Sequence, residues 1–365
     1  MFDKRFVLLL TLLIGLLGLL AACGETATPV ATNPAATTSA VGTVMAASTA
    51  PAAFSGPTAK VTLALDWTPN TNHTGIYVAQ AKNYYKQQGI DLQILPYSDS
   101  ATPETLVGTG KADFGISGEE STVFAIATGQ PIVSVAAIIQ HDTSALVTLK
   151  DSGLTRPKDL EGKKYAGFGA PYEEPVIGTM IKHDGGSTGK FQNVTVNTAG
   201  FEAVVAKQAD FVWIFMGWDG IQAKHQNVQL NTIPITKYGI PDRYTPVIIG
   251  SQDVLKNKAD VAKRFMTATA QGYRYAIANP KEAADILVDA NKDALNDKAF
   301  VEDSQAYLSP KYAEGAAYWG QQDLKVWTDY TKFVYQNGIL TDASSKPLTK
   351  EPDYASFFSN DLLPK

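Results

Sequence analysis

The chain has 365 residues, a formal net charge of −5 and a single cysteine. Mild acidity without a cluster of Lys and Arg argues against nucleic acid as a partner, and one cysteine excludes an internal disulfide. From residue 60 onwards the chain has about 300 residues. This is more than one hydrophobic core typically includes, and it predicts two lobes.

Residues 1–22 have the three regions of a secretory signal peptide: a basic start, an apolar run and small residues. Lys4 and Arg5 precede the apolar run from 6 to 20, which is shorter than the roughly 20 residues of a membrane-spanning helix. The Leu-Ala-Ala-Cys that follows resembles the lipobox of bacterial lipoproteins. This resemblance implies that Cys23 carries lipid and anchors the protein at the extracytoplasmic face of the cell membrane.

Ten strand-like apolar runs alternate with helical segments along the rest of the chain. They cover residues 61–65, 90–95, 114–116, 132–139, 145–149, 164–167, 194–197, 211–215, 230–234 and 247–250. Such alternation predicts an α/β fold with mainly parallel sheets and helices on both faces. Helical patterns over 254–278, 281–288, 297–308 and 324–337 predict a helix-rich tail.

The order of these segments predicts a discontinuous first lobe. A helix start at Thr155 marks the entry into a second lobe, and the strand at 247–250 marks the return. The stretch before the first strand is rich in Ala, Thr and Pro, which is typical of a disordered tether. We therefore expect a tether over 23–59, a first lobe from 60–149 and 250–365, and a second lobe over 150–249. Two crossing strands between lobes make a hinge that closes around a small ligand.

The first strand is followed by a polar turn with Asp66, Trp67, Asn70 and His73. In open α/β sheets, ligands lie beyond the carboxyl ends of strands, so this turn is a candidate site. Trp67 is a candidate for stacking on a flat heterocycle, with a core Trp at the sheet edge as the alternative. Asn70 suits the edge of a pyrimidine or caps the next helix. A single His for which we expect no nearby carboxylate is typical of a polar contact or a cap, with catalysis as the alternative.

Three motifs occur in order: D-W-x-P-N-x-x-H at 66–73, A-K-x-Y-Y-K-x-x-G at 81–89 and G-K-A-D-F-G-I at 110–116. Together they resemble the periplasmic-binding-protein family whose members bind the pyrimidine precursor of thiamine, and close relatives that bind riboflavin. The resemblance implies a two-lobed, type II periplasmic-binding-protein fold. It also implies that the protein is the solute-binding component of an ABC importer, with a vitamin-like ligand and a membrane permease as partners.

Candidate ligand contacts also follow three later strands. Ser117 and Glu119 lie where a helix begins, and free N–H groups there suit an anion or carbonyl, although the Glu also complements the helix dipole without a ligand.

In the second lobe, Tyr172 and Glu174 lie in a Gly-rich turn. The resemblance implies a carboxylate here that pairs with ring N–H or amino groups, and Glu174 is preferred, with a first-turn Glu as the alternative. Trp218 lies past the end of an aromatic strand.

Three aromatic walls, from Trp67, Tyr172 and Trp218, favour riboflavin over a thiamine pyrimidine precursor of the hydroxymethylpyrimidine type. A sulfonate or nitrate binder of the same fold would favour more Arg around the site. Enzymes that resemble this chain and build the pyrimidine from a pyridoxal cofactor require a Lys and a Cys-rich motif, and Cys23 is the only cysteine. Without paired His spacing, a P-loop or a catalytic motif, we expect no metal, no cofactor and binding rather than turnover.

Overall fold

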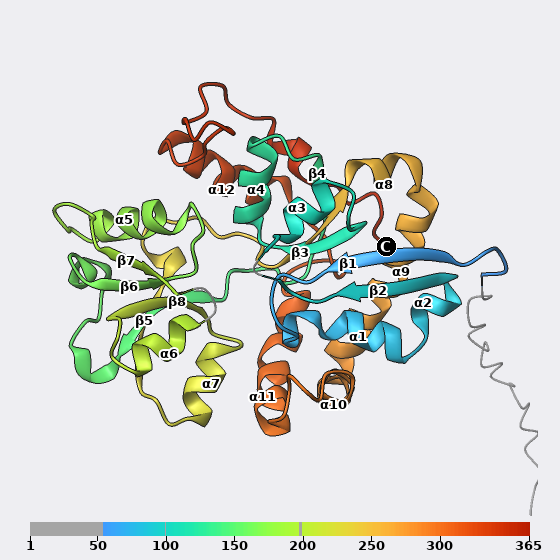
Figure 1. Ribbon diagram of the computed structural model, residues 1–365, viewed down its shortest axis with the longest axis horizontal. Helices are drawn as coiled ribbons and strands as arrows, with labels where there is room; N and C mark the ends of the chain where they lie inside the picture. Colours follow the sequence, from blue (N-terminus) through green and yellow to red (C-terminus); the bar gives the residue numbers. More distant parts are fainter. Residues whose placement is uncertain (1–53, 99, 197–198) are drawn as a thin grey trace, which may run out of the picture. The chain divides into compact units, whose positions relative to one another are not determined.

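The computed structural model describes residues 54–98, 100–196 and 199–365, so the predicted lipid attachment at Cys23 lies outside the described residues. The ten predicted strands are confirmed, in two five-stranded sheets (Figure 1). The first sheet has the order β2-β1-β3-β10-β4. Its strands are β1 (Ala59–Ala64), β2 (Ile90–Leu95), β3 (Phe114–Ser117), β4 (Ile132–Ala137) and β10 (Val247–Ser251).

The second sheet repeats this arrangement with the order β7-β6-β8-β5-β9. Its strands are β5 (Ser144–Leu149), β6 (Lys164–Gly167), β7 (Gln192–Thr195), β8 (Phe211–Phe215) and β9 (Leu230–Pro234). Each sheet is mixed, because β10 runs antiparallel to β3 and β4, and β5 runs antiparallel to β8 and β9. The predicted two-lobed α/β class is thus present, with one reversed strand in each lobe.

The helices of the first lobe precede and follow those of the second in the chain. The first lobe has α1 (Thr74–Ala81), α2 (Tyr84–Gln87), α3 (Pro103–Gly108), α4 (Glu119–Ala127), α8 (Gln252–Asn257), α9 (Ala259–Ala278), α10 (Pro280–Ala290), α11 (Lys298–Leu308) and α12 (Leu324–Gln336). The second lobe has α5 (Glu173–His183), α6 (Gly200–Val205) and α7 (Asp219–His225). Short 3₁₀ helices include η1 (Thr71–His73) and η6 (Ser309–Tyr312).

Two boundaries differ from the expectation. We placed β5 in the first lobe, but it pairs with β8 and β9, so the chain crosses between the lobes before Ser144. An apolar run predicts a strand but not the sheet that the strand joins. The expected tether also ends earlier than residue 59, because the Phe54 N–H donates to the Gln87 carbonyl at 2.8 Å and the Arg264 guanidinium lies 4.0 Å from the Phe54 ring centre.

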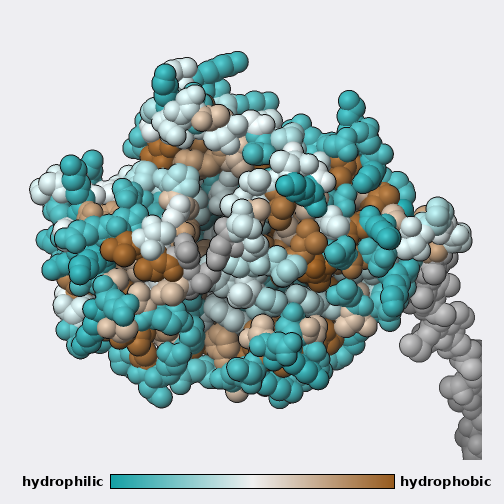
Figure 2. Space-filling view, viewed as in Figure 1, coloured by the Kyte–Doolittle hydropathy of each residue, from teal (hydrophilic) through white to brown (hydrophobic). Residues whose placement is uncertain are grey.

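The core of the first lobe is built between its sheet and the long helix α9. Phe265 of α9 stacks on Phe114 of β3 with ring centres 4.3 Å apart. A Cβ on Gly272 of α9 would lie 1.9 Å from the carbonyl oxygen of Gly75 in α1, so only a glycine permits this close approach of the two helices. The face of the molecule in Figure 2 is mostly hydrophilic, with hydrophobic side chains in small separate groups. Among the described residues, no helix has the length and apolar character needed to cross a membrane.

The crossing segments fix where the two lobes meet. Val247, the first residue of β10, pairs with Ser117 at the carboxyl end of β3, and Ser144, the first residue of β5, pairs with Phe215 at the carboxyl end of β8. Because β10 and β5 are reversed, both crossings arrive at the carboxyl edges of the sheets. The loops that follow the parallel strands therefore converge on the crossing region, which is where ligands bind in open α/β sheets.

Candidate ligand-binding site

Hydrogen bonds fix the turn that follows β1. The Asn70 side chain accepts the Asn72 N–H at 2.8 Å and donates to the Thr68 carbonyl at 3.0 Å, so it caps η1. His73 Nδ1 accepts the Asn70 N–H at 3.3 Å. The ring proton therefore resides on Nε2, which donates to Asp66 Oδ1 at 2.8 Å. His73 is fully buried, whereas 29% of the Asp66 side chain is exposed.

The expectation that no carboxylate lies near His73 was wrong, because the turn folds Asp66 back onto the ring. The buried His73 orients the Asp66 carboxylate, and the exposed part of that carboxylate remains accessible to a ligand. The carbonyl oxygen and the amino group of the Asn70 side chain both form hydrogen bonds within the turn. Direct ligand contacts of Asn70 and His73 stay predictions, and the structure gives both residues a positioning role.

Two aromatic side chains, Trp67 and Tyr97, follow the ends of neighbouring strands. Trp67 directly follows Asp66, and its ring centre is 5.6 Å from that of Tyr97, with the planes tilted by 37°. Both side chains are half-buried. Tyr97 follows β2, the strand next to β1, so two neighbouring strand ends bring the rings together. An aromatic face beside a carboxylate can stack on a flat ring and accept hydrogen bonds from its amino group.

Ser117 lies at the end of β3 and is buried. Its hydroxyl donates to Glu104 of α3 and lies 3.0 Å from the Thr122 hydroxyl. Burial raises the pKa of Glu104, the Ser117 hydrogen bond lowers it, and the nearby Asp66 adds a smaller increase. Because the Ser117 hydroxyl bonds within the protein, its ligand contact stays a prediction.

Glu119 joins the start of α4 to the second crossing segment. Its backbone N–H donates to the Tyr244 carbonyl at 2.9 Å, and its Oε2 accepts the Tyr244 N–H at 2.9 Å. Burial raises the pKa of Glu119 well above its ordinary value, and the Tyr244 hydrogen bond only partly opposes this. Oε1 is buried without a hydrogen-bond partner. A ligand contact of Glu119 stays a prediction.

A buried arginine links the two crossings. Arg243 Nη1 donates to Asp142 Oδ2 at 3.0 Å, and Arg243 Nε lies 3.4 Å from Glu120 Oε1, with all three side chains at most 3% exposed. The guanidinium carbon also lies 5.3 Å from the centre of the Trp213 ring. Burial would lower the pKa of Arg243, but the carboxylates of Asp142 and Glu120 raise it above its ordinary value. Asp142 lies on the first crossing and Arg243 on the second, so this pair holds the hinge together.

Tyr172 lies where the lobes touch. It is 5% exposed, and its ring centre lies 5.9 Å from Phe124 of α4 and 6.1 Å from Trp213 of β8. Its ring therefore packs between α4 and the second sheet. Tyr172 as a wall of the ligand site stays a prediction.

The two glutamates at the start of α5 face different ways. Glu173 is buried and accepts the backbone N–H groups of Phe168, at 3.0 Å, and of Ala170. It therefore fixes the Gly-rich turn from within, and burial raises its pKa. Glu174 is exposed and accepts from Asn193 Nδ2 at 3.0 Å. Its pairing with a ligand stays a prediction, and in this arrangement its carboxylate lies at the surface.

Trp218 contacts the first lobe. Its ring lies 4.5 Å from the ring of Phe300 in α11, in an edge-to-face arrangement at 69°. The structure thus brings Trp67, Asn70 and His73 together in one turn. Trp218, which precedes α7, packs against Phe300 of α11 instead. The ligand contact of Trp218 stays a prediction.

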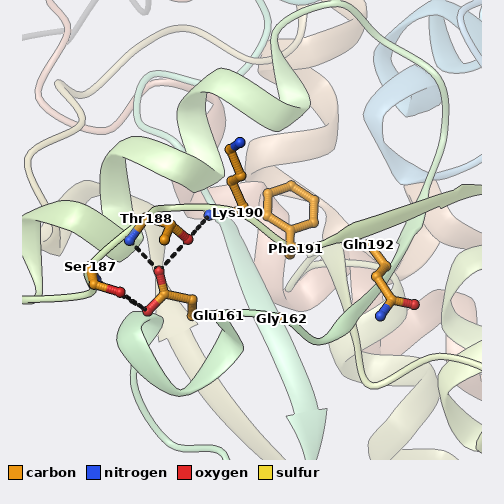
Figure 3. A pocket seen from close by; sticks show the side chains of 7 residues that line it. All are labelled: Glu161, Gly162, Ser187, Thr188, Lys190, Phe191 and Gln192. Atoms are coloured by element: carbon orange, nitrogen blue, oxygen red, sulfur yellow. Dashed lines mark hydrogen bonds between the residues drawn. The ribbon is translucent and has the colours of Figure 1, made fainter.

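Two surface depressions of the second lobe lie away from this region. One of about 460 Å³ surrounds Glu161 (Figure 3), whose carboxylate accepts the N–H groups of Ser187 at 3.1 Å, Gly189 at 3.0 Å and Thr188. Hydrogen bonds, those from Thr188 above all, lower the pKa of Glu161 to about 2, so the protein's own carboxylate fills this cradle. The other, of about 440 Å³, includes Leu149. Both lie at the amino edge of the second sheet, opposite the crossings.

Several residues of the site were missed from the sequence. Asp66 lies in the predicted turn without a predicted role, and the sequence predicts no role for Tyr97, Glu104 or Arg243. Tyr97 had a usable signal, since it lies two residues after the end of a predicted strand. Arg243 had only the signal of a charged residue shortly before a buried strand. Within the described part of the chain, no three His, Asp, Glu or Cys side chains are grouped to hold a metal ion.

Two curated relatives align with most of the chain. The formylaminopyrimidine-binding protein of Halalkalibacterium halodurans is 26% identical over 303 residues, which cover 81% of this chain and 89% of the relative. A 4-amino-5-hydroxymethyl-2-methylpyrimidine phosphate synthase of Saccharomyces cerevisiae is 26% identical over 325 residues, which cover 84% and 88%.

A solved structure with a similar fold is the ligand-binding component of an ABC-type import system from Staphylococcus aureus. It has a TM-score of 0.61 and 14% identity, and the match covers 83% of this chain and 97% of that one. The likeness shows the fold alone, which is the predicted two-lobed periplasmic-binding-protein fold. The family model described as NMT1/THI5 like matches residues 70–283, more than half of the chain. The chain therefore belongs to the NMT1/THI5-like family.

Proposed function

We propose that this protein is the solute-binding component of an ABC importer and that it captures a pyrimidine precursor of thiamine. The observation that carries the proposal is the partly exposed Asp66 carboxylate, oriented by the buried His73, in the same turn as Trp67, whose ring lies 5.6 Å from that of Tyr97. An aminopyrimidine stacks on the rings and donates its amino N–H to Asp66. The name of the relative that binds formylaminopyrimidine supports this ligand class.

The structure weakens the case for riboflavin. Riboflavin was favoured because three aromatic walls were expected, but Tyr172 is buried between α4 and β8, and Trp218 packs on Phe300. Trp67 and Trp218 are both half-buried, but only Trp67 lies in the turn that carries Asp66. The relatives also support the pyrimidine rather than the flavin.

Binding without turnover is the second part of the proposal. Yeast relatives are named as synthases, so an enzyme is the alternative. The Cys-rich motif that the sequence resemblance attributes to such enzymes is missing, because Cys23 is the only cysteine in the chain. Incubation with pyridoxal phosphate should therefore yield no pyrimidine product by chromatography.

Calorimetric titration of the full chain in detergent tests the ligand. We expect formylaminopyrimidine or hydroxymethylpyrimidine to bind tightly and to stabilise the fold by mass action, about 2.7 kcal/mol at a hundredfold excess over the dissociation constant. Riboflavin and an alkanesulfonate serve as the competing ligands. Tight binding of either of these, with no heat from both pyrimidines, would overturn the pyrimidine assignment.

We also propose that lipid on Cys23 holds the protein at the extracytoplasmic face of the membrane, where it meets the permease. The basic start, the apolar run and Leu-Ala-Ala-Cys support this. We expect the wild type to partition into the detergent phase and the Cys23→Ala variant to lose this partitioning. A processed Cys23→Ala protein that still partitions with detergent contradicts lipid attachment.

A further inference from the structure

A single serine of the first lobe connects the candidate ligand turn to the second lobe. Ser304 of α11 is fully buried, and its hydroxyl donates to the Gly217 carbonyl at 2.5 Å. Its oxygen also lies 2.6 Å from the Thr71 hydroxyl. Because the one Ser304 proton goes to Gly217, the Thr71 hydroxyl is the donor to Ser304. The result is a directed chain from Thr71 through Ser304 to Gly217, in which each bond polarises the next.

The first end of this chain is firmly held. Thr71 begins η1, within the turn that carries Asp66 and His73. The Tyr312 hydroxyl donates to the Thr71 carbonyl at 2.5 Å, and the Thr74 hydroxyl donates to Gln305 Oε1 at 2.6 Å. α11 and the segment after it thus fix the turn at its buried side.

The other end belongs to the second lobe. Gly217 follows β8 and precedes α7, and α7 lies beside α11 (Figure 1). His225 of α7 lies 2.9 Å from Asp303 of α11, next to the contact between Trp218 and Phe300. When the lobes separate, Gly217 leaves α11 and Ser304 loses this acceptor. The bond from Ser304 to Gly217 therefore exists only while the lobes are together.

Gly217 also fits α11 sterically. A Cβ at this position would lie 2.6 Å from a methyl carbon of Leu308, which is buried in the first lobe. An added methyl group therefore opposes the closed arrangement and meets no such neighbour once the lobes separate. This steric effect is independent of any hydrogen bond of Ser304.

We propose that Ser304 is a positioning residue that holds the lobes closed through Gly217 and links closure to the ligand turn through Thr71. The link to ligand capture rests on the proposed function, whereas the hold on the lobes does not. One net hydrogen bond corresponds to a change of about two- to tenfold in an equilibrium. Loss of the Ser304 hydroxyl should therefore lower the ratio of closed to open molecules by this factor.

The test compares Ser304→Ala, Gly217→Ala and a matched control, Ser309→Ala. Ser309 is also buried; it donates to the Ala276 carbonyl at 3.0 Å and accepts from Gln305 Nε2 at 2.8 Å, but both bonds stay within the first lobe. Small-angle X-ray scattering is measured without ligand and with formylaminopyrimidine. We expect Ser304→Ala and Gly217→Ala to have a larger radius of gyration than the wild type, and Ser309→Ala to match the wild type. We also expect Ser304→Ala and Gly217→Ala to release formylaminopyrimidine about two- to tenfold faster than the wild type.

Scattering by Ser304→Ala and Gly217→Ala that equals that of Ser309→Ala in both conditions overturns the proposal. If Ser304→Ala alone changes scattering, its effect is structural and the proposal also fails. If formylaminopyrimidine does not bind the wild type, the proposed function fails, and the ligand-free scattering still decides the role of Ser304.

Discussion

Replacement of Arg243 by alanine should lower the free energy of unfolding by about 3 to 5 kcal/mol, the scale for a buried ion pair that loses one partner. Asp142 and Glu120 would then remain buried without a cation, since their side chains are at most 3% exposed. Chemical denaturation at neutral pH measures the loss. The loss should shrink as the pH falls towards about 4, because burial raises the pKa of Glu120, so this carboxyl group takes up a proton in the folded protein at a higher pH than in the unfolded chain.

Arg156→Ala is the matched control. Arg156 also pairs with one carboxylate, Asp184, but its side chain is 46% exposed. The Asp184 side chain is 7% exposed, but solvent screens the pair on the Arg156 side, so this variant should lose less stability than Arg243→Ala. A double variant, Arg243→Ala with Asp142→Asn, should recover part of the stability because one buried charge is removed. Equal destabilisation by Arg243→Ala and Arg156→Ala would contradict the buried hinge pair.

The Asp66→Asn variant should bind the pyrimidine about 10- to 100-fold more weakly than the wild type. Hydrogen bonds to charged groups contribute about 1.5 to 3 kcal/mol, and each 1.4 kcal/mol is tenfold in affinity. The amide oxygen of Asn can still accept the proton from His73 Nε2, so the turn should keep its conformation. Calorimetric titration of the folded variant measures the change in affinity.

Asp113→Asn is the control for this experiment. Asp113 lies just before β3, at the opposite edge of the same sheet, and accepts the Thr62 N–H at 2.9 Å. Its replacement changes the same charge far from the candidate site, so we expect unchanged affinity even if stability falls. Wild-type affinity of Asp66→Asn would remove Asp66 from the site, and an equal loss in Asp113→Asn would point to net charge instead of contact.

Much of the fold was predictable because strands and helices are set by local patterns. Apolar runs located all ten strands, and the helical pattern of the tail located α9 to α12 within a few residues. Apolar residues recur at near-helical spacing from Thr74, which predicts one helix up to Gly89, but the structure breaks this helix because Asn83 has a left-handed backbone, with φ 60°. Asn adopts this conformation more readily than most residues, so such a break is compatible with the sequence but not dictated by it.

The candidate site was predictable only where it is local. The turn from Asp66 to His73 is one short segment, and its ligand-type groups were found from residue type and from its place after a strand. Tyr97 lies on another strand end and Arg243 on the second crossing, and nothing in the spacing of the chain relates either residue to the turn.

By itself, the sequence determined the α/β class, the strand positions and the polar turn after β1, because each depends on neighbours within a few residues, and the chain length and the order of its segments indicated the two lobes. Only the tertiary structure decided which sheet takes β5, which glutamate of α5 is buried, and that Trp218 meets α11. Glu173 and Glu174 are adjacent in one helix and point in directions about 100° apart, so the docking of that helix selects the buried one. These outcomes depend on how strands and helices dock on one another, which the spacing of residues within one segment does not specify.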